Sequence, residues 1–142
     1  MIARTLFAAA LLAAVASPVF AGPAEDNARA HFKAIGAGQV DAIMDQYASD
    51  ATFQWIGGPL NGAYAGADKI KEVWTKFTKS GPFYVSLAKV EESANDKGAI
   101  VTANVRFEGK SDIKVRYSLV YRDGKLVNEV WQIDPKLSMS GY

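Results

Sequence analysis

The spacing of apolar residues changes once along this chain, at Ser80-Gly81-Pro82, and that change most constrains the fold. Before this point apolar residues recur at i, i+3, i+4 and i+7, which is typical of helices that bury one face. After it they alternate with polar residues, which is typical of strands. Helices collected ahead of strands predict an α+β fold, because parallel βαβ units would interleave the two.

The pattern also predicts where the elements lie. Glycine-rich or Asn-Gly and Asp-Gly stretches separate them, since these residues favour turns. We expect helices over 23–38, 40–47 and 67–78, a strand over 51–56, a turn-rich loop over 57–66, and strands over 83–87, 101–107, 113–121 and 126–133. Short turns over 95–98, 108–111 and 122–125 predict that the last four strands form an antiparallel meander.

Residues 1–21 have the pattern of a cleaved signal peptide. Arg4 precedes an apolar run from Leu6 to Ala16, and small residues end the segment at Ala21. The run is too short for a transmembrane helix, which needs about 20 apolar residues. We therefore expect a domain over 22–142 that is exported to the periplasm or secreted, with no membrane attachment after cleavage.

Composition excludes several kinds of site. The chain has no cysteine and one histidine, so disulfides, thiolate nucleophiles and multi-histidine metal sites are ruled out. A formal net charge of +1 gives no excess for nucleic-acid binding. The glycines of the 57–66 loop lack the spacing of a phosphate-binding loop. We accordingly expect no metal, no cofactor and no nucleic-acid partner.

Three stretches, in this order, resemble the nuclear transport factor 2-like superfamily in its SnoaL-like and ketosteroid-isomerase-like branch. They lie within 38–53, 66–70 and 123–131. The resemblance implies a cone: a curved antiparallel sheet wrapped around three N-terminal helices, with a central pocket between the first helix and the concave face. It also implies that two copies can pair across the convex face. Members include enzymes and binding modules, so the resemblance leaves the chemistry open.

The sequence departs from the residues that steroid isomerases use. The resemblance places the catalytic carboxylate position at Trp55, the helix-one tyrosine position at His31, and the strand aspartate position at Tyr117 or Ser118. A tryptophan cannot abstract a proton, so the usual steroid-isomerase mechanism is excluded.

His31 and Glu129 are the candidates for proton transfer. His31 carries the one side chain whose ordinary pKa is near neutrality, and Glu129 shares a strand face with Trp131 that, by the resemblance, points into the cone. Tyr117 would donate a hydrogen bond to developing negative charge. The alternatives are structural: His31 as a cap on the core, and Glu129 in an ion pair with Arg106, Arg116 or His31.

Aromatic residues on the expected inward faces predict the kind of ligand that the domain binds. Trp55, Tyr117 and Trp131 fall on expected inward faces and would form an aromatic wall, whereas Trp74 is expected in the core. Tyr47, Arg116 and Ser118 complete the expected ligand-contacting set. We expect an exported domain that binds a small apolar or aromatic molecule.

Two other functions remain open at this point. One is a cofactor-free isomerase, lyase or cyclase that uses His31 and Glu129. The other is a dimerisation or protein-interaction module that uses the convex face, for which these residues are expected to be exposed: Ile100, Thr102, Asn104, Arg106 and Glu108.

Overall fold

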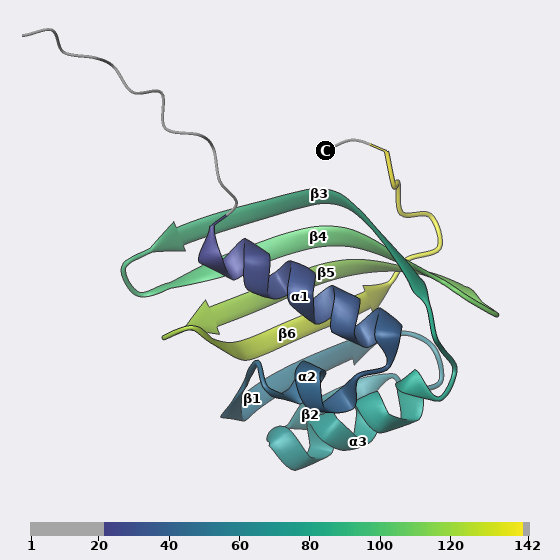
Figure 1. Ribbon diagram of the computed structural model, residues 1–142, viewed down its shortest axis with the longest axis horizontal. Helices are drawn as coiled ribbons and strands as arrows, with labels where there is room; N and C mark the ends of the chain where they lie inside the picture. Colours follow the sequence, from purple (N-terminus) through teal and green to yellow (C-terminus); the bar gives the residue numbers. More distant parts are fainter. Residues whose placement is uncertain (1–21, 141–142) are drawn as a thin grey trace, which may run out of the picture.

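A computed structural model describes residues 22–140 of the chain. The expected signal peptide, over 1–21, lies outside these described residues. The elements in chain order are α1 (Pro23–Ala37), α2 (Val40–Met44), β1 (Tyr47–Ile56), β2 (Gly62–Ala65), α3 (Ala67–Thr78), β3 (Tyr84–Asn95), β4 (Gly98–Glu108), β5 (Asp112–Arg122) and β6 (Lys125–Ile133) (Figure 1). Among the helices of this described part, none is long and apolar enough to cross a membrane.

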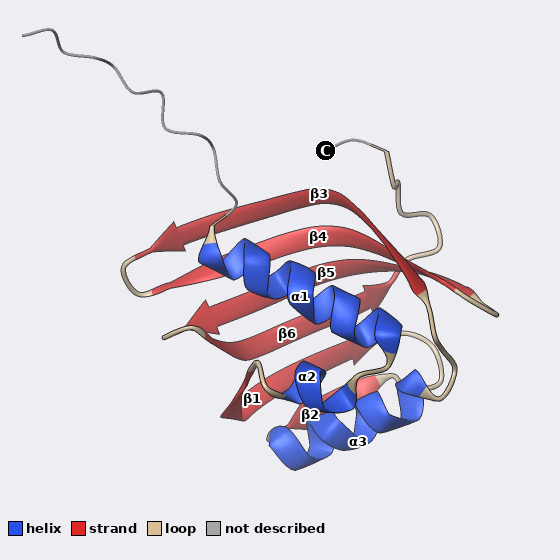
Figure 2. Cartoon of the chain, viewed as in Figure 1, coloured by secondary structure: helices blue, strands red, loops and turns tan. Residues whose placement is uncertain are grey.

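The strands form one curved sheet in the order β2-β1-β6-β5-β4-β3. All neighbours are antiparallel except β1 and β6, which are parallel. Figure 2 shows the helices on one side of this sheet, with α1 across its concave face and α3 beside β1 and β2. The expected α+β cone of helices and a curved, mainly antiparallel sheet is confirmed, as is the β3 to β6 meander.

Two elements differ from the sequence-based expectation. Tyr47, expected at the end of the second helix, begins β1, because α2 ends at Met44 and Tyr47 pairs with Leu126 of β6. The expected loop over 57–66 contains β2, which pairs with β1 in antiparallel register. The first difference comes from pairing with a strand distant in the sequence, and the second from a four-residue hairpin strand inside a stretch rich in turn residues.

A glutamate from β3 fastens the start of α1 to the sheet. Glu92 Oε1 accepts hydrogen bonds from the backbone N–H groups of Ala24 and Glu25, at 2.9 and 3.2 Å. A Cβ at Gly22 would lie 1.5 Å from Glu92 Oε2, so any other residue there would require the Glu92 side chain to shift. The contact satisfies backbone donors that have no partner within the helix and places a negative charge at its positive end.

Aromatic side chains fill the centre of the cone, where the sequence led us to expect a pocket. Trp131 is fully buried at the middle of this group. The ring centroids of five neighbours lie 4.4 to 5.7 Å from that of Trp131: Trp55, Trp74, Phe77, Phe107 and Tyr117. These bulky rings come from α3 and from four strands, and together they occupy the space that smaller residues would leave open.

The convex face is partly covered by the segment that follows β6. Ile100 and Thr102 are exposed as expected, but Asn104 is buried. Its Nδ2 donates a hydrogen bond to the carbonyl oxygen of Ser138 at 2.9 Å, and Leu137 is also buried. The expectation that Asn104 is exposed is therefore wrong, because residues after β6 turn back over β4.

Candidate functional site

Three side chains from different elements converge on the Glu129 carboxylate of β6. His31 Nε2 of α1 lies 2.6 Å from Oε2, and the hydroxyl of Tyr117 in β5 donates to the same oxygen at 2.6 Å. The hydroxyl of Tyr47, at the start of β1, donates to Oε1. Trp74 Nε1–H of α3 in turn donates to the Tyr47 oxygen at 2.8 Å. We call Glu129, His31, Tyr117, Tyr47 and Trp74 the Glu129 cluster.

The spacing of buried residues along α1 and the pairing of the strands bring these residues together. His31 lies on the buried face of α1, in line with Ala28 and Ile35. Leu119 of β5 and Phe53 of β1 sit directly opposite Glu129 in the sheet. The carboxylate therefore enters an apolar interior, where an unpaired charge would be strongly destabilising.

The hydrogen bonds of the cluster replace water around the carboxylate. His31 and Glu129 have no exposed area. We place the proton of the His31 contact on Nε2, because the carboxyl oxygens already act as acceptors for two phenols. Within residues 22–140, His31 Nδ1 and the indole N–H groups of Trp55 and Trp131 are buried without a hydrogen-bond partner.

Burial makes the phenols of the cluster very weak acids. Burial first, and then the charge of Glu129, hold the pKa of both Tyr47 and Tyr117 well above the ordinary tyrosine value. Both phenols therefore remain hydrogen-bond donors across the physiological pH range. The cluster contains the kinds of residue that a proton-transfer site uses, but each of them is buried.

The residues expected to form the site lie in three places: the Glu129 cluster, the aromatic rings beside it and the convex face. His31, Glu129 and Tyr117, expected to be catalytic, meet in the cluster together with Tyr47. Trp55 and Trp131 stack on one another beside it, with centroids 4.4 Å apart.

Arg116 and Ser118 are not part of this site. They alternate with the inward-facing Tyr117 on β5, and both line a hollow of about 420 Å³ on the convex face. Arg116 Nη2 lies 3.4 Å from Asp134. The expectation that these two residues join Trp55 and Trp131 around a ligand is wrong, because successive strand residues face opposite sides of a sheet.

A cavity of about 330 Å³ opens on the concave side at one end of the cone. It lies between the end of α3, the β1–β2 loop and the adjacent ends of β5 and β6. Trp55 is the one expected ligand-contacting residue that lines it. The apolar lining is Trp55, Pro59, Leu60, Phe77, Phe83, Ile113 and Ile133, and the polar lining is Lys76, Ser80 and Ser111.

Sequence reasoning missed most of this lining. Phe77 and Phe83 stand on either side of the Gly81-Pro82 break, and their rings stack with centroids 5.1 Å apart. A turn at that break would bring them together, so their spacing was the available signal. Nothing local in the sequence connects them to Ser111 or Ile133.

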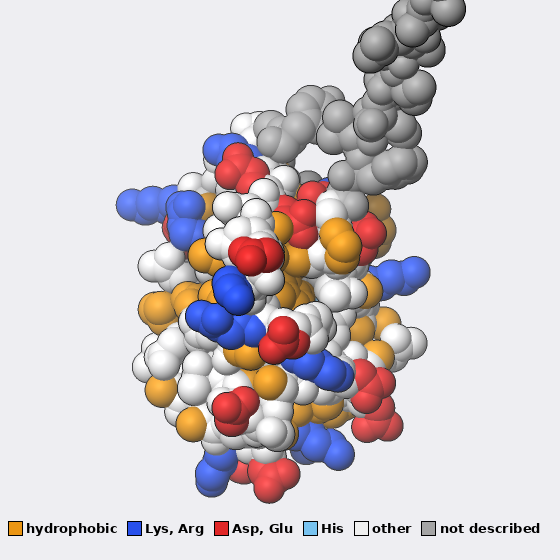
Figure 3. Space-filling view, turned by 90° about the vertical axis from the view of Figure 1, so that its left-hand side faces the viewer, with side chains coloured by type: hydrophobic (Ala, Val, Ile, Leu, Met, Phe, Trp, Pro, Cys, Tyr) orange, Lys and Arg blue, Asp and Glu red, His pale blue; other side chains and the backbone are white. Residues whose placement is uncertain are grey.

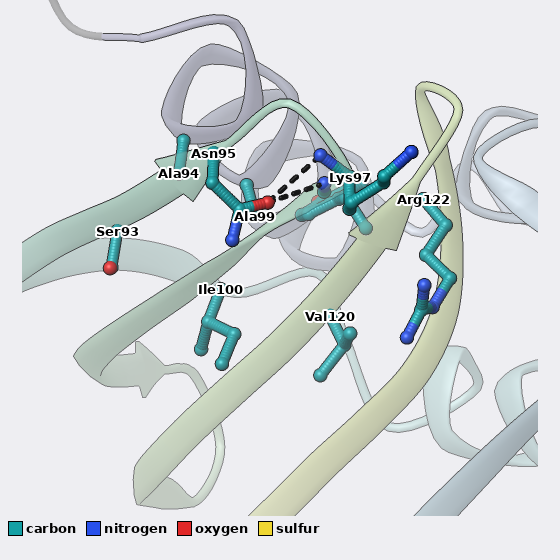
Figure 4. A pocket seen from close by; sticks show the side chains of 10 residues that line it. Ser93, Ala94, Asn95, Lys97, Ala99, Ile100, Val120 and Arg122 are labelled. Carbon is teal, nitrogen blue, oxygen red and sulfur yellow. Dashed lines mark hydrogen bonds between the residues drawn. The ribbon is translucent and has the colours of Figure 1, made fainter.

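Four other hollows within residues 22–140 have at most one aromatic residue each in their lining. One of about 250 Å³ lies at the β3–β4 turn, beside Lys97 and Arg122 (Figure 4). There the side-chain oxygen of Asn95 already accepts hydrogen bonds from the backbone N–H groups of Lys97 and Gly98. Figure 3 shows an end of the molecule where acidic and basic side chains are interspersed rather than gathered by sign. Within residues 22–140, no three His, Asp or Glu side chains are grouped to hold a metal ion.

Solved structures share this architecture. A proposed aromatic ring hydroxylase from Novosphingobium aromaticivorans is 21% identical, with a TM-score of 0.67 over 82% of this chain and 90% of that one. A proposed dehydratase of the NTF2-like family from Streptomyces avermitilis is 13% identical, with a TM-score of 0.68 over 80% and 95%. An NTF-2 like protein of unknown function from Burkholderia xenovorans LB400 is 16% identical, with a TM-score of 0.62 over 84% and 88%. At these identities the likeness shows the fold alone.

Among curated proteins none matches the chain. The family model of the SnoaL-like domain does match it, over residues 28–129. That range includes α1 from Ala28 onward, the cluster residues His31, Tyr47, Trp74, Tyr117 and Glu129, and five of the six strands in full. The chain therefore belongs to the SnoaL-like family and has its NTF2-like fold.

Proposed function

We propose that this chain is an exported domain that binds a small, largely apolar molecule in the cavity beside Trp55. The observation that carries the proposal is the cavity itself. Its volume, about 330 Å³, is in the usual range for small-molecule sites, and rings of Trp55, Phe77 and Phe83 form its walls. Aromatic walls with a few polar groups favour flat, apolar ligands.

The packed interior supports this assignment by holding the walls in place. Trp55 stacks on Trp131, and Phe77 stacks on Phe83. The Glu129 cluster ties α1, α3, β1, β5 and β6 to one another behind these rings. A preformed wall lowers the entropy that a ligand would otherwise lose in ordering it.

A neutral fluorescent probe, N-phenyl-1-naphthylamine, tests the proposal. We expect its emission to rise on binding, and we expect Ser111→Trp to raise the dissociation constant at least tenfold by filling the cavity. Lys110→Trp is the matched control, because Lys110 is exposed and does not line the cavity. Absence of binding, or equal weakening in both variants, would contradict the proposal.

Proton-transfer catalysis is the second candidate, and the direct contact between His31 and Glu129 favours it. A substrate would have to displace Tyr47 or Tyr117 from the carboxylate in order to reach it. The test is deuterium exchange into a bound ligand with an acidic C–H group, followed by NMR in D2O. Exchange that Glu129→Gln abolishes would support catalysis, and no exchange in the unaltered protein would exclude it for that ligand.

Export is tested separately. When the full sequence is expressed in a Gram-negative bacterium, we expect the protein in the periplasmic fraction with Gly22 as its first residue, as N-terminal sequencing would show. An uncleaved cytoplasmic product would contradict export and leave the binding proposal standing.

Pairing of two copies across the convex face is also proposed, as a feature of assembly. Ile100 there is 48% exposed, and such a pairing would bury its side chain. Sedimentation should show a dimer that Ile100→Glu dissociates. A monomer at all concentrations would exclude this pairing.

A further inference from the structure

The cavity beside Trp55 has one charged residue in its lining, and that residue is basic. Lys76 lies in the last turn of α3, and the other polar lining residues are Ser80 and Ser111. No Asp or Glu contributes to this lining. A cationic ligand group would therefore find no counter-charge at the wall, whereas an anionic group would find one.

Lys76 is available to a ligand. Its Nζ lies 3.4 Å from Glu72 Oε1, one helical turn earlier, and both side chains are 59% exposed. Exposed pairs of this kind are weak, because water screens the charges and both side chains lose freedom when they pair. The ammonium group can thus turn toward the cavity at little cost.

Further charged residues lie next to the cavity and outside its lining. Asp112 follows Ser111 in the chain, but Arg106 holds it in a two-pronged contact at 2.9 and 2.8 Å. A neighbouring hollow of about 460 Å³ shares Pro59, Ser111, Ile113 and Ile133 with the cavity, and its lining adds Asp112 and Lys114. Arg106 also lies 3.2 Å from Glu108, so charges of both signs surround the cavity, and Lys76 supplies the one charge in its lining.

Two hydroxyl groups complete the polar part of the cavity. Ser80 and Ser111 both line it. Both residues are exposed, so each hydroxyl can donate to a ligand oxygen.

From this arrangement, and resting on the proposed function, we infer that the ligand is an aromatic carboxylate. Its ring lies among Trp55, Phe77 and Phe83, and its carboxylate binds Lys76 Nζ with help from the serine hydroxyls. Charge-assisted hydrogen bonds of this kind are stronger than neutral ones. A cavity of about 330 Å³ is large enough for a ligand with two fused rings.

Three ligands with the same naphthalene ring test the inference: 2-naphthoate, 2-naphthylmethanol and 2-naphthylmethylammonium. Binding is measured by calorimetry on the unaltered protein at fixed ionic strength. We expect the carboxylate to bind at least tenfold more tightly than the alcohol, and the ammonium compound to bind more weakly than both.

Lys76→Met should weaken naphthoate binding about tenfold and leave the alcohol unchanged. Lys76→Arg should retain most of the naphthoate affinity. Lys79→Met is the matched control, since Lys79 lies three residues further along, is exposed and does not line the cavity.

The outcomes separate this inference from the proposed function. Equal affinity for acid and alcohol would overturn the anionic class and leave small-molecule binding intact. A loss in Lys79→Met as large as in Lys76→Met would also overturn it, because general surface charge would then explain the attraction. If none of the three ligands binds and N-phenyl-1-naphthylamine also fails, the proposed function falls with it.

Discussion

Glu129 is the residue on which the interior of this molecule depends most. Its carboxylate is fully buried, yet it meets an imidazole and two phenols. Each partner offsets part of the cost of removing a charge from water, so the loss of any one partner leaves that charge less compensated.

Tyr117→Phe should therefore destabilise the protein, although it removes one oxygen atom only. We expect the free energy of unfolding to fall by about 1–3 kcal/mol, because one hydrogen bond to a buried charged group is lost. Urea denaturation measures the change. Tyr84→Phe is the control, since Tyr84 is 74% exposed, and an equal effect in both variants would contradict a special role for Tyr117.

The buried tyrosines also predict how stability depends on pH. Burial raises the pKa of Tyr47, Tyr117 and Tyr121 in the folded protein. A group with a raised folded pKa contributes its full stability below the unfolded pKa, near 10, and loses it as pH rises toward the folded pKa.

We accordingly expect the free energy of unfolding to fall above about pH 10, by about 1.4 kcal/mol per pH unit for each such tyrosine. Denaturation at a series of pH values measures the slope, and Tyr117→Phe should reduce it. Unchanged stability between about pH 10 and 11 would contradict the assignment.

At the scale of elements, α1 depends on its contact with β3. Glu92 is half-buried and accepts from two backbone donors at the start of the helix. The cap of this helix is therefore Glu92, which lies 68 positions after Ala24 in the sequence, and not a charged side chain of α1 itself.

Glu92→Ala should lower the free energy of unfolding by about 0.5–2 kcal/mol, the range for loss of a helix cap. Amide hydrogen exchange at Ala24 and Glu25 should accelerate more than exchange in α3. Glu92→Gln keeps an acceptor but loses the charge, so it should have a smaller effect. Uniform acceleration along both helices would show instead that Glu92 acts on global stability.

The elements themselves were largely predictable. The boundaries of α3 match the expected 67–78, because a single apolar stripe over Ile70, Val73, Trp74 and Phe77 distinguishes it. Tyr47 was not predictable as a strand residue, because its partner Leu126 is distant in the sequence. Strand β2 was missed because it has four residues and lies in a stretch whose glycines, proline and Asn-Gly pair indicate turns. Local patterns report which face of a segment is apolar, and they do not report which segment will cover it.

At the scale of the whole molecule, the cone is held by aromatic packing. Trp131 contacts rings from α3 and three other strands. This packing displaces the expected pocket from the centre to the end of the cone, where Trp55 marks the boundary between core and cavity.

Trp131→Ala should remove the centre of this packing. We expect a loss of about 3–5 kcal/mol, the range for truncating a buried tryptophan. Ile56→Ala, at a side chain 45% exposed, should change stability by less than about 0.5 kcal/mol. Thermal unfolding measures both, and a loss below about 1 kcal/mol for Trp131→Ala would indicate a loosely packed interior.

The sequence by itself determined the class of fold, the order of all elements except β2, and that Glu129 and Trp131 share one face of the last strand. These follow from the period of apolar residues, which each segment carries alone. That this face points inward was implied by the resemblance to the SnoaL-like family. Only the tertiary structure decided that His31, and not Arg106 or Arg116, meets Glu129, and that Lys76, Phe83 and Ser111 border one cavity. Those contacts join residues far apart in the chain, and their distances depend on how the sheet curves and how large rings share the space inside it.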